Sequence, residues 1–126
     1  MTNSTRQKQR RFVELLYKST NNRMLSWEQN SAGQLYVSIA SGTLFLEKTN
    51  NNVGEDLIVF KLFGRDDKLA EKFSDDEIAY DPLTPEGFNS WFDICNALCE
   101  LAKRRASGAD DVLDSMIDEL EDNFPF

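Results

Sequence analysis

Residues 34–46 read QLYVSIASGTLFL, and this segment gives the clearest indication of the fold. Apolar and polar residues alternate from Leu35 to Ile39, which is typical of a strand with one buried face. Ser41-Gly42 supplies the residue types of a tight turn, and the apolar residues that follow predict a returning strand. Because so short a connection joins only antiparallel neighbours, this stretch predicts a β-hairpin.

Three further segments extend the hairpin into a sheet. Residues 25–27 alternate and predict a first strand. Residues 57–63 read LIVFKLF, the most apolar run, and predict a central strand covered on much of both faces. Residues 68–73 fit either an edge strand with alternating lysines or one helical turn. The short connections favour an antiparallel meander of three or four strands.

A helical pattern precedes this meander. Apolar residues recur at helical spacing within residues 5–20, and Asn21-Asn22 is suited to end the helix. The first two turns of this helix are basic and lack apolar side chains. Positive charge at a helix N-terminus opposes the helix dipole, which indicates solvent exposure or an acidic neighbour.

Two more helices follow the meander. Thr84-Pro85-Glu86 combines an N-cap residue, a proline at the first helical position and an acid in the first turn. An apolar stripe then runs from Phe88 to Ala102, and the second helix breaks at Ser107-Gly108. A last helix is predicted from about residue 110 to residue 122. The chain is therefore predicted to be an α+β protein with a two-layer architecture of helix, meander and two helices.

The length of 126 residues corresponds to one domain. We expect residues 1–5 to be disordered and residues 109–126 to form an acidic C-terminal helix and tail, which either docks on the domain or projects from it. The tail Phe124-Pro125-Phe126 either folds back onto the domain or acts as a docking tag.

The net charge of −8 is unevenly distributed. Residues 1–23 carry six basic side chains and one acidic one, a balance of +5, which leaves −13 for the remainder. An acidic protein repels phosphate backbones and anionic lipids, so nucleic acid and membrane partners are not expected. The basic start could instead pair with the acidic end of a second copy or with an acidic partner.

Composition also limits the chemistry. The chain has no histidine, which excludes catalytic triads and histidine-ligated zinc within it. Cys95 and Cys99 stand four residues apart on the predicted second helix, a poor spacing for a disulfide, and are interpreted as small buried hydrophobes. No signal peptide or membrane-spanning run is evident, so we expect a cytoplasmic protein.

The order of these features resembles a set of small uncharacterised bacterial proteins with a helix–meander–helix plan. The resemblance rests on Leu25-x-Trp27-Glu28, Tyr36, Leu44-x-Leu46 and Leu98-x-x-Leu101-Ala102-x-Arg104-Arg105. It spans roughly residues 12–120. It implies the fold plan alone and transfers no activity, cofactor or site residue.

Acidic clusters offer the main enzymatic alternative. Asp56, followed by Asp66 and Lys68, has the residue types with which some nucleases hold Mg²⁺ and orient water. The clusters at 66–67, 75–77 and after residue 110 lack EF-hand spacing, and residues 50–55 match it poorly. Phosphate-binding loops and nucleophile elbows are absent from the sequence. We therefore expect no catalytic residue, metal or cofactor, with a small metal-dependent hydrolase as the alternative.

The remaining features favour a non-enzymatic protein–protein interaction module, such as an inhibitor or adaptor, with a structural homodimer as a further alternative. Aromatic residues at strand and helix spacing are usually core, but they become binding anchors when they lie on an open sheet face. The last helix has an acidic face opposite an apolar one. The predicted partner-binding residues are Trp27, Tyr36, Asp111, Asp114, Asp118 and Glu121.

Overall fold

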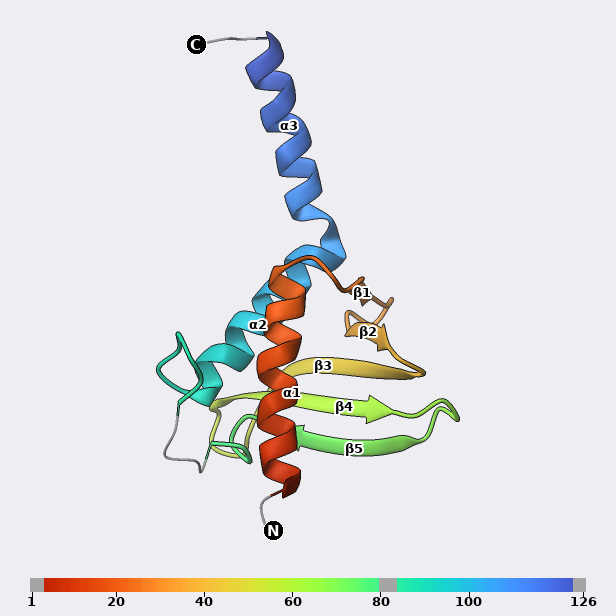
Figure 1. The fold of residues 1–126 in the computed structure, drawn as a ribbon, viewed down its shortest axis with the longest axis vertical. Coiled ribbons are helices and arrows are strands. Elements are labelled where there is room, and N and C mark those ends of the chain that lie inside the picture. The colour runs from red at the N-terminus through yellow and green to blue at the C-terminus, as the bar shows by residue number, and fades with distance from the viewer. Residues whose placement is uncertain (1–3, 80–83, 124–126) are drawn as a thin grey trace.

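The computed structural model describes residues 4–79 and 84–123 and confirms the α+β class (Figure 1). Its elements, in chain order, are α1 (Ser4–Asn21), β1 (Glu28–Gln29), β2 (Leu35–Ile39), β3 (Gly42–Asn50), β4 (Asp56–Phe63), β5 (Leu69–Ser74), α2 (Trp91–Ser107) and α3 (Ala109–Asn123). Residues 4 and 5, expected to be disordered, belong to the first turn of α1. The tail at 124–126 lies outside the described residues.

The five strands form one antiparallel meander in the order β1-β2-β3-β4-β5, one strand more than the largest sheet expected. Residues 69–74 pair with β4, so the strand interpretation of this segment is confirmed over the helical one. The first strand lies at 28–29 and not at 25–27, where it was predicted. The indole of Trp27 donates a hydrogen bond to Thr20 at 3.0 Å, which holds this segment against α1 instead of in the ladder.

The hairpin between β2 and β3 turns at Ala40-Ser41, one residue earlier than predicted. Ala40 adopts the left-handed conformation at φ 55°, and Ile39 pairs directly with Gly42. Gly42 is required for a different reason, because a Cβ atom there would lie 2.6 Å from the carbonyl oxygen of Phe63. The glycine therefore permits close approach of β3 to the end of β4, and the turn itself is made without it.

Helix α2 begins at Trp91, and the predicted start at 84–86 is wrong. Gly87 has φ 85°, a left-handed conformation that interrupts a right-handed helix at this point. Ser90 is the actual N-cap, and its hydroxyl accepts a hydrogen bond from the backbone N–H of Asp93 at 3.1 Å. Phe88 stays outside the helix and packs edge-on against Tyr17 at 5.1 Å between ring centroids.

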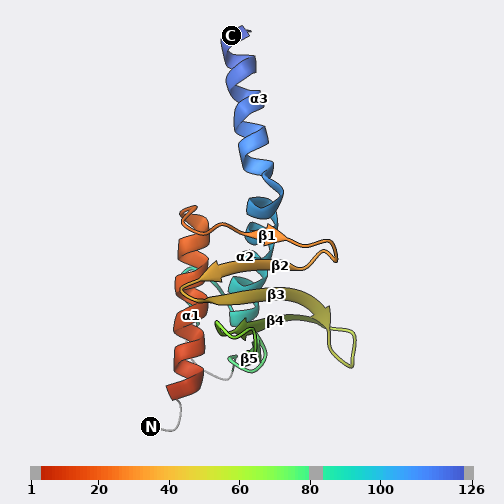
Figure 2. The same cartoon turned by 90° about the vertical axis from the view of Figure 1, so that its right-hand side faces the viewer.

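One hydrophobic core lies between the helices and the sheet. Helices α1 and α2 pack against each other, and their apolar faces meet the inward-facing side chains of the strands. Residues that are completely buried include Val13, Ile58, Phe60, Leu98 and Cys95. Figures 1 and 2 show that α3 lies outside this arrangement and points away from the sheet beyond the end of α2.

The end of β5 is held by a buried carboxylate. Asp75 accepts a hydrogen bond from the N–H of Ile58 at 2.7 Å, and its own N–H donates to the Ile58 carbonyl at 3.0 Å. Burial is the main cause that raises the pKa of Asp75; the Ile58 hydrogen bond opposes it, and the neighbouring Asp76 adds to it. The side chain thus acts as one more ladder partner after β5 ends.

Replacing Asp75 by asparagine is expected to leave stability at neutral pH unchanged or raised, whereas alanine is expected to lower the free energy of unfolding by about 1–3 kcal/mol. Asparagine keeps the acceptor for Ile58 without a buried charge, and alanine leaves that N–H unpaired. Because the pKa of Asp75 is raised in the folded state, the free energy of unfolding of the wild type should increase as pH falls through that pKa. The difference in stability between the wild type and Asp75→Asn should therefore become smaller at acidic pH. Urea unfolding of the wild type and the two variants at neutral and acidic pH measures these free energies. Equal losses of stability in the asparagine and alanine variants would contradict the prediction.

Candidate functional site

The position of α3 is set at a single left-handed residue. Gly108 ends α2 at φ 71°, and its N–H donates to carbonyl oxygens of the last turn of α2. Ala109 starts the next helix directly, and its N–H donates to the Ser107 hydroxyl at 3.3 Å. Asp110 and Asp111 in the first turn favour the positive end of the helix dipole. The chain therefore changes direction within one residue and continues as a separate helix.

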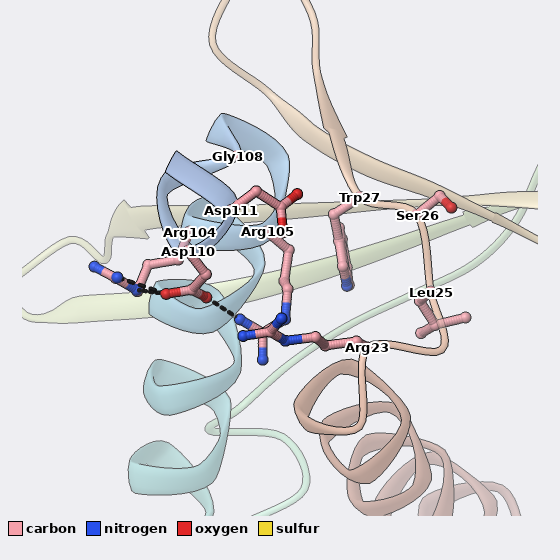
Figure 3. A pocket seen from close by; sticks show the side chains of 9 residues that line it. All are labelled: Arg23, Leu25, Ser26, Trp27, Arg104, Arg105, Gly108, Asp110 and Asp111. Atoms are coloured by element: carbon pink, nitrogen blue, oxygen red, sulfur yellow. Dashed lines mark hydrogen bonds and ion pairs between the residues drawn. The ribbon is translucent and has the colours of Figure 1, made fainter. Parts of the chain in front are cut away.

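A group of charged residues fixes this junction (Figure 3). We call it the junction cluster, and it consists of Arg104, Arg105 and Asp110. Arg104 and Arg105 each hydrogen-bond a different oxygen of the Asp110 carboxylate. Arg105 also donates to the carbonyl oxygens of Thr20 at 3.2 Å and Asn21 at 3.3 Å, the end of α1. Hydrogen bonding from Arg104, with the charges of the nearby arginines, lowers the pKa of Asp110.

A cavity of about 330 Å³ lies beside the junction cluster (Figure 3). It is lined by the cluster itself, by residues of the segment that leads into β1, and by the start of α3: Arg23, Leu25, Ser26 and Trp27 from that segment, with Gly108 and Asp111 from the helix junction. The guanidinium groups of Arg104 and Arg105 both pair with Asp110, whose single carboxylate offsets one of their two positive charges. This cavity therefore belongs to the joint between α1, α2 and α3, and its charged groups serve that joint.

Helix α3 has no buried residue within Ala109–Asn123. Its large apolar side chains gather on one side of the helix and remain open to solvent; Ile117 is 41% exposed and Met116 is 59% exposed. We call this set the apolar stripe of α3: Val112, Leu113, Met116, Ile117 and Leu120. At 100° per residue the stripe covers about 140° of the helix circumference, the width of a face that normally packs on a core.

The rest of the α3 surface is acidic. The helix carries seven carboxylates and no lysine or arginine. Four of them are the predicted partner-binding residues Asp111, Asp114, Asp118 and Glu121, of which Asp114 lies 3.7 Å from Arg23 in an exposed ion pair. The structure thus places all four on one projecting helix, on the side opposite the apolar stripe, with Glu121 the nearest of them to its edge.

The two aromatic residues predicted to bind a partner have different environments. Trp27 is only 4% exposed and belongs to the core, so it is not on an open sheet face. Tyr36 is half-buried and lies on the sheet face opposite the core, where its ring contacts Phe45, which in turn contacts Phe63. Only Tyr36 therefore meets the condition under which an aromatic residue would present a binding surface.

The residues of the hydrolase alternative are not brought together. Asp56 begins β4, whereas Asp66 and Lys68 lie in the turn after its other end. Eight residues of strand separate these ends by about 25 Å. Asp66 accepts a hydrogen bond from the N–H of Lys68 at 3.1 Å, and Asp56 lies 3.8 Å from Lys48. Each acid thus has a local structural role, and the set does not form one site.

The other acidic and cysteine-containing segments are also occupied by local contacts. Asp76 and Glu77 accept hydrogen bonds from Ser74, and Glu77 pairs with Arg6 at 3.2 Å. Cys95 and Cys99 are free and buried, and burial raises the pKa of both thiols. Across residues 4–79 and 84–123, no three histidine, cysteine, aspartate or glutamate side chains converge as a metal site. None of the helices in these ranges has the length and apolar character of a bilayer crossing.

Comparison with protein-family models, with curated proteins and with solved structures finds no match to this chain.

The sequence predicts the apolar stripe of α3 as one face of the last helix, but it does not predict that this face is exposed. The predicted partner contacts on the last helix were its acids, because an apolar helix face is ordinarily assigned to a core. The signal that could have revealed the exposure is the single-residue break at Gly108. So short a connection leaves α3 no length of chain with which to fold back over the sheet.

Proposed function

We propose that this chain is a protein-binding module that docks a partner along α3. The observation that carries the proposal is the apolar stripe of α3, five large side chains left uncovered on a helix with no buried residue. Contiguous exposed apolar patches on otherwise well-packed proteins mark interaction sites. An amphipathic helix presented in this way matches the helix-in-groove and helix-on-helix modes of recognition.

The energetics of α3 support this proposal. An isolated helix of 15 residues is marginally stable in water, because most helical stability in proteins comes from packing of an apolar face. Here the contacts of α3 with the rest of the chain are concentrated at its first turns, through the junction cluster and Arg23. A partner that covers the apolar stripe would therefore supply the packing that α3 lacks in the free chain and so stabilise the helix.

The test is a triple variant of the stripe, Leu113→Gln with Ile117→Gln and Leu120→Gln. Glutamine preserves helix propensity while it removes the apolar surface. Wild-type and variant chains are immobilised, exposed to a lysate of the native host, and compared by quantitative mass spectrometry. We expect at least one host protein to be retained by the wild type and reduced at least tenfold on the variant.

Two controls make this comparison specific. Val53→Gln with Leu69→Gln removes exposed apolar side chains from other sites, and the host protein should be retained. Tyr36→Ala tests the open sheet face, and we expect this variant also to retain the host protein. Loss of the host protein on Tyr36→Ala with retention on the triple variant would reject α3 as the docking element.

A further inference from the structure

We propose that the partner docked on α3 is a basic amphipathic helix of another protein, whose apolar residues cover the stripe while its lysines and arginines flank it. This inference rests on the proposed function and adds the chemistry of the partner. It depends on two features of α3, the charge on both edges of the stripe and the charge at the C-terminal end of the helix. It also depends on the poor fit of a second copy of the chain to this surface.

Acidic residues border the apolar stripe on both sides. On a helical projection Glu119 lies next to Val112 at one edge, and Glu121 lies next to Ile117 at the other. No ion pair engages Asp111, Asp118, Glu119 or Glu121 within the described part of the chain. In paired helices the positions that flank the apolar seam select the partner by charge. Acids on both edges therefore select basic residues on both edges of the partner.

The C-terminal end of α3 adds to this preference. Glu119, Glu121 and Asp122 occupy the last turns, where no basic residue is present. The negative end of the helix dipole makes these carboxylates unfavourable in the free chain. Cationic side chains from a partner would relieve that repulsion, so their attraction should be strongest at the far end of the stripe. The apolar contact itself spans about 12 Å from Val112 to Leu120, which two to three turns of a partner helix would cover.

A second copy of the chain fits this surface less well. Pairing α3 with α3 would bring seven carboxylates on each helix together, which opposes association. The basic helix α1 presents Lys8, Arg11 and Lys18 to solvent, but Leu15 is its one large apolar residue that is strongly exposed within residues 5–21. One leucine cannot cover five apolar side chains, so a copy of α1 offers the charge without the matching apolar face.

The test uses three synthetic amphipathic peptides of identical length. The first has a leucine stripe with lysine elsewhere, the second replaces each lysine by glutamate, and the third keeps the lysines but replaces leucine by serine. Fluorescence anisotropy measures the affinity of each labelled peptide for the full chain. We expect the lysine–leucine peptide to bind at least tenfold more tightly than either of the others, and to weaken as salt is raised.

Charge reversal on α3 completes the test. The variant Glu119→Lys with Glu121→Lys should move the preference from the lysine peptide to the glutamate peptide, while the control Asp66→Lys with Asp67→Lys, which changes the net charge equally, should leave the preference unchanged. Equal binding of the lysine and glutamate peptides, or no binding of either, overturns the inference, as does self-association of the chain through α3 in sedimentation equilibrium. If the host protein is still lost on the glutamine triple variant, docking through α3 stands although the partner is not a basic helix.

Discussion

Phe60→Ala is expected to lower the free energy of unfolding by about 3–5 kcal/mol. Phe60 is completely buried on β4, and its ring stacks on that of Phe73 at 4.7 Å between centroids and 6° between planes. Alanine would remove the apolar contacts and leave a cavity that the surrounding strands and helices cannot fill, since protein interiors are close-packed. Urea unfolding followed by tryptophan fluorescence measures the loss.

The matched control for this variant is Leu113→Ala on the apolar stripe of α3. Its side chain is 51% exposed, so its truncation should change the free energy of unfolding by less than about 0.5 kcal/mol. The contrast separates a packed apolar side chain from an uncovered one in the same protein. A loss at Leu113 comparable to the loss at Phe60 would show that α3 is packed on the domain, which contradicts the exposed arrangement.

Arg105→Ala is expected to lower the free energy of unfolding by about 1.5–3 kcal/mol and to release the direction of α3. The Arg105 side chain is largely buried and joins three helices, through carbonyl oxygens of α1 and the carboxylate of Asp110 on α3. Its removal leaves these acceptors without their charged donor. Urea unfolding gives the stability, and the distance distribution between spin labels at residues 7 and 115 reports the orientation of α3.

Arg104→Ala is the control for the junction cluster. Arg104 bonds the same carboxylate, but half of its side chain is exposed, and such pairs contribute at most about 1 kcal/mol. Its distance distribution should stay close to that of the wild type, and the distribution in Arg105→Ala should broaden. Equal losses in the two variants, or an unchanged distribution in Arg105→Ala, would show that Arg105 does not hold α3.

The pH dependence of the junction cluster follows from the lowered pKa of Asp110. A carboxylate whose pKa is depressed in the folded state stabilises that state above its ordinary pKa, and this contribution is lost as pH falls through the lowered value. The orientation of α3 in the wild type should therefore persist to a more acidic pH than it would if the pKa of Asp110 had its ordinary value.

Local periodicity was a reliable guide where one face of an element is buried. The strand of Leu35–Ile39 and the helix α1 match their predictions to within about two residues, because burial of one face imposes a period of two or of 3.6 on the sequence. The extent of α3 also matches its prediction, although no residue of α3 is buried within the domain. Boundaries set by single backbone conformations were missed. Thr84-Pro85-Glu86 has every local signal of a helix start, yet Gly87 takes a left-handed conformation and the helix begins at Trp91.

Local periodicity, connection length and charge are enough to predict the α+β class, the order of the elements, the antiparallel pairing and the separation of acidic from apolar residues on α3. Packing in three dimensions was needed to learn that Trp27 is buried, that Asp56 and Asp66 lie at opposite ends of β4, and that the apolar stripe of α3 is uncovered. An amphipathic pattern states that a face favours burial, but it carries no information about what covers it. Here one left-handed glycine and an arginine that joins three helices turn that face away from the core.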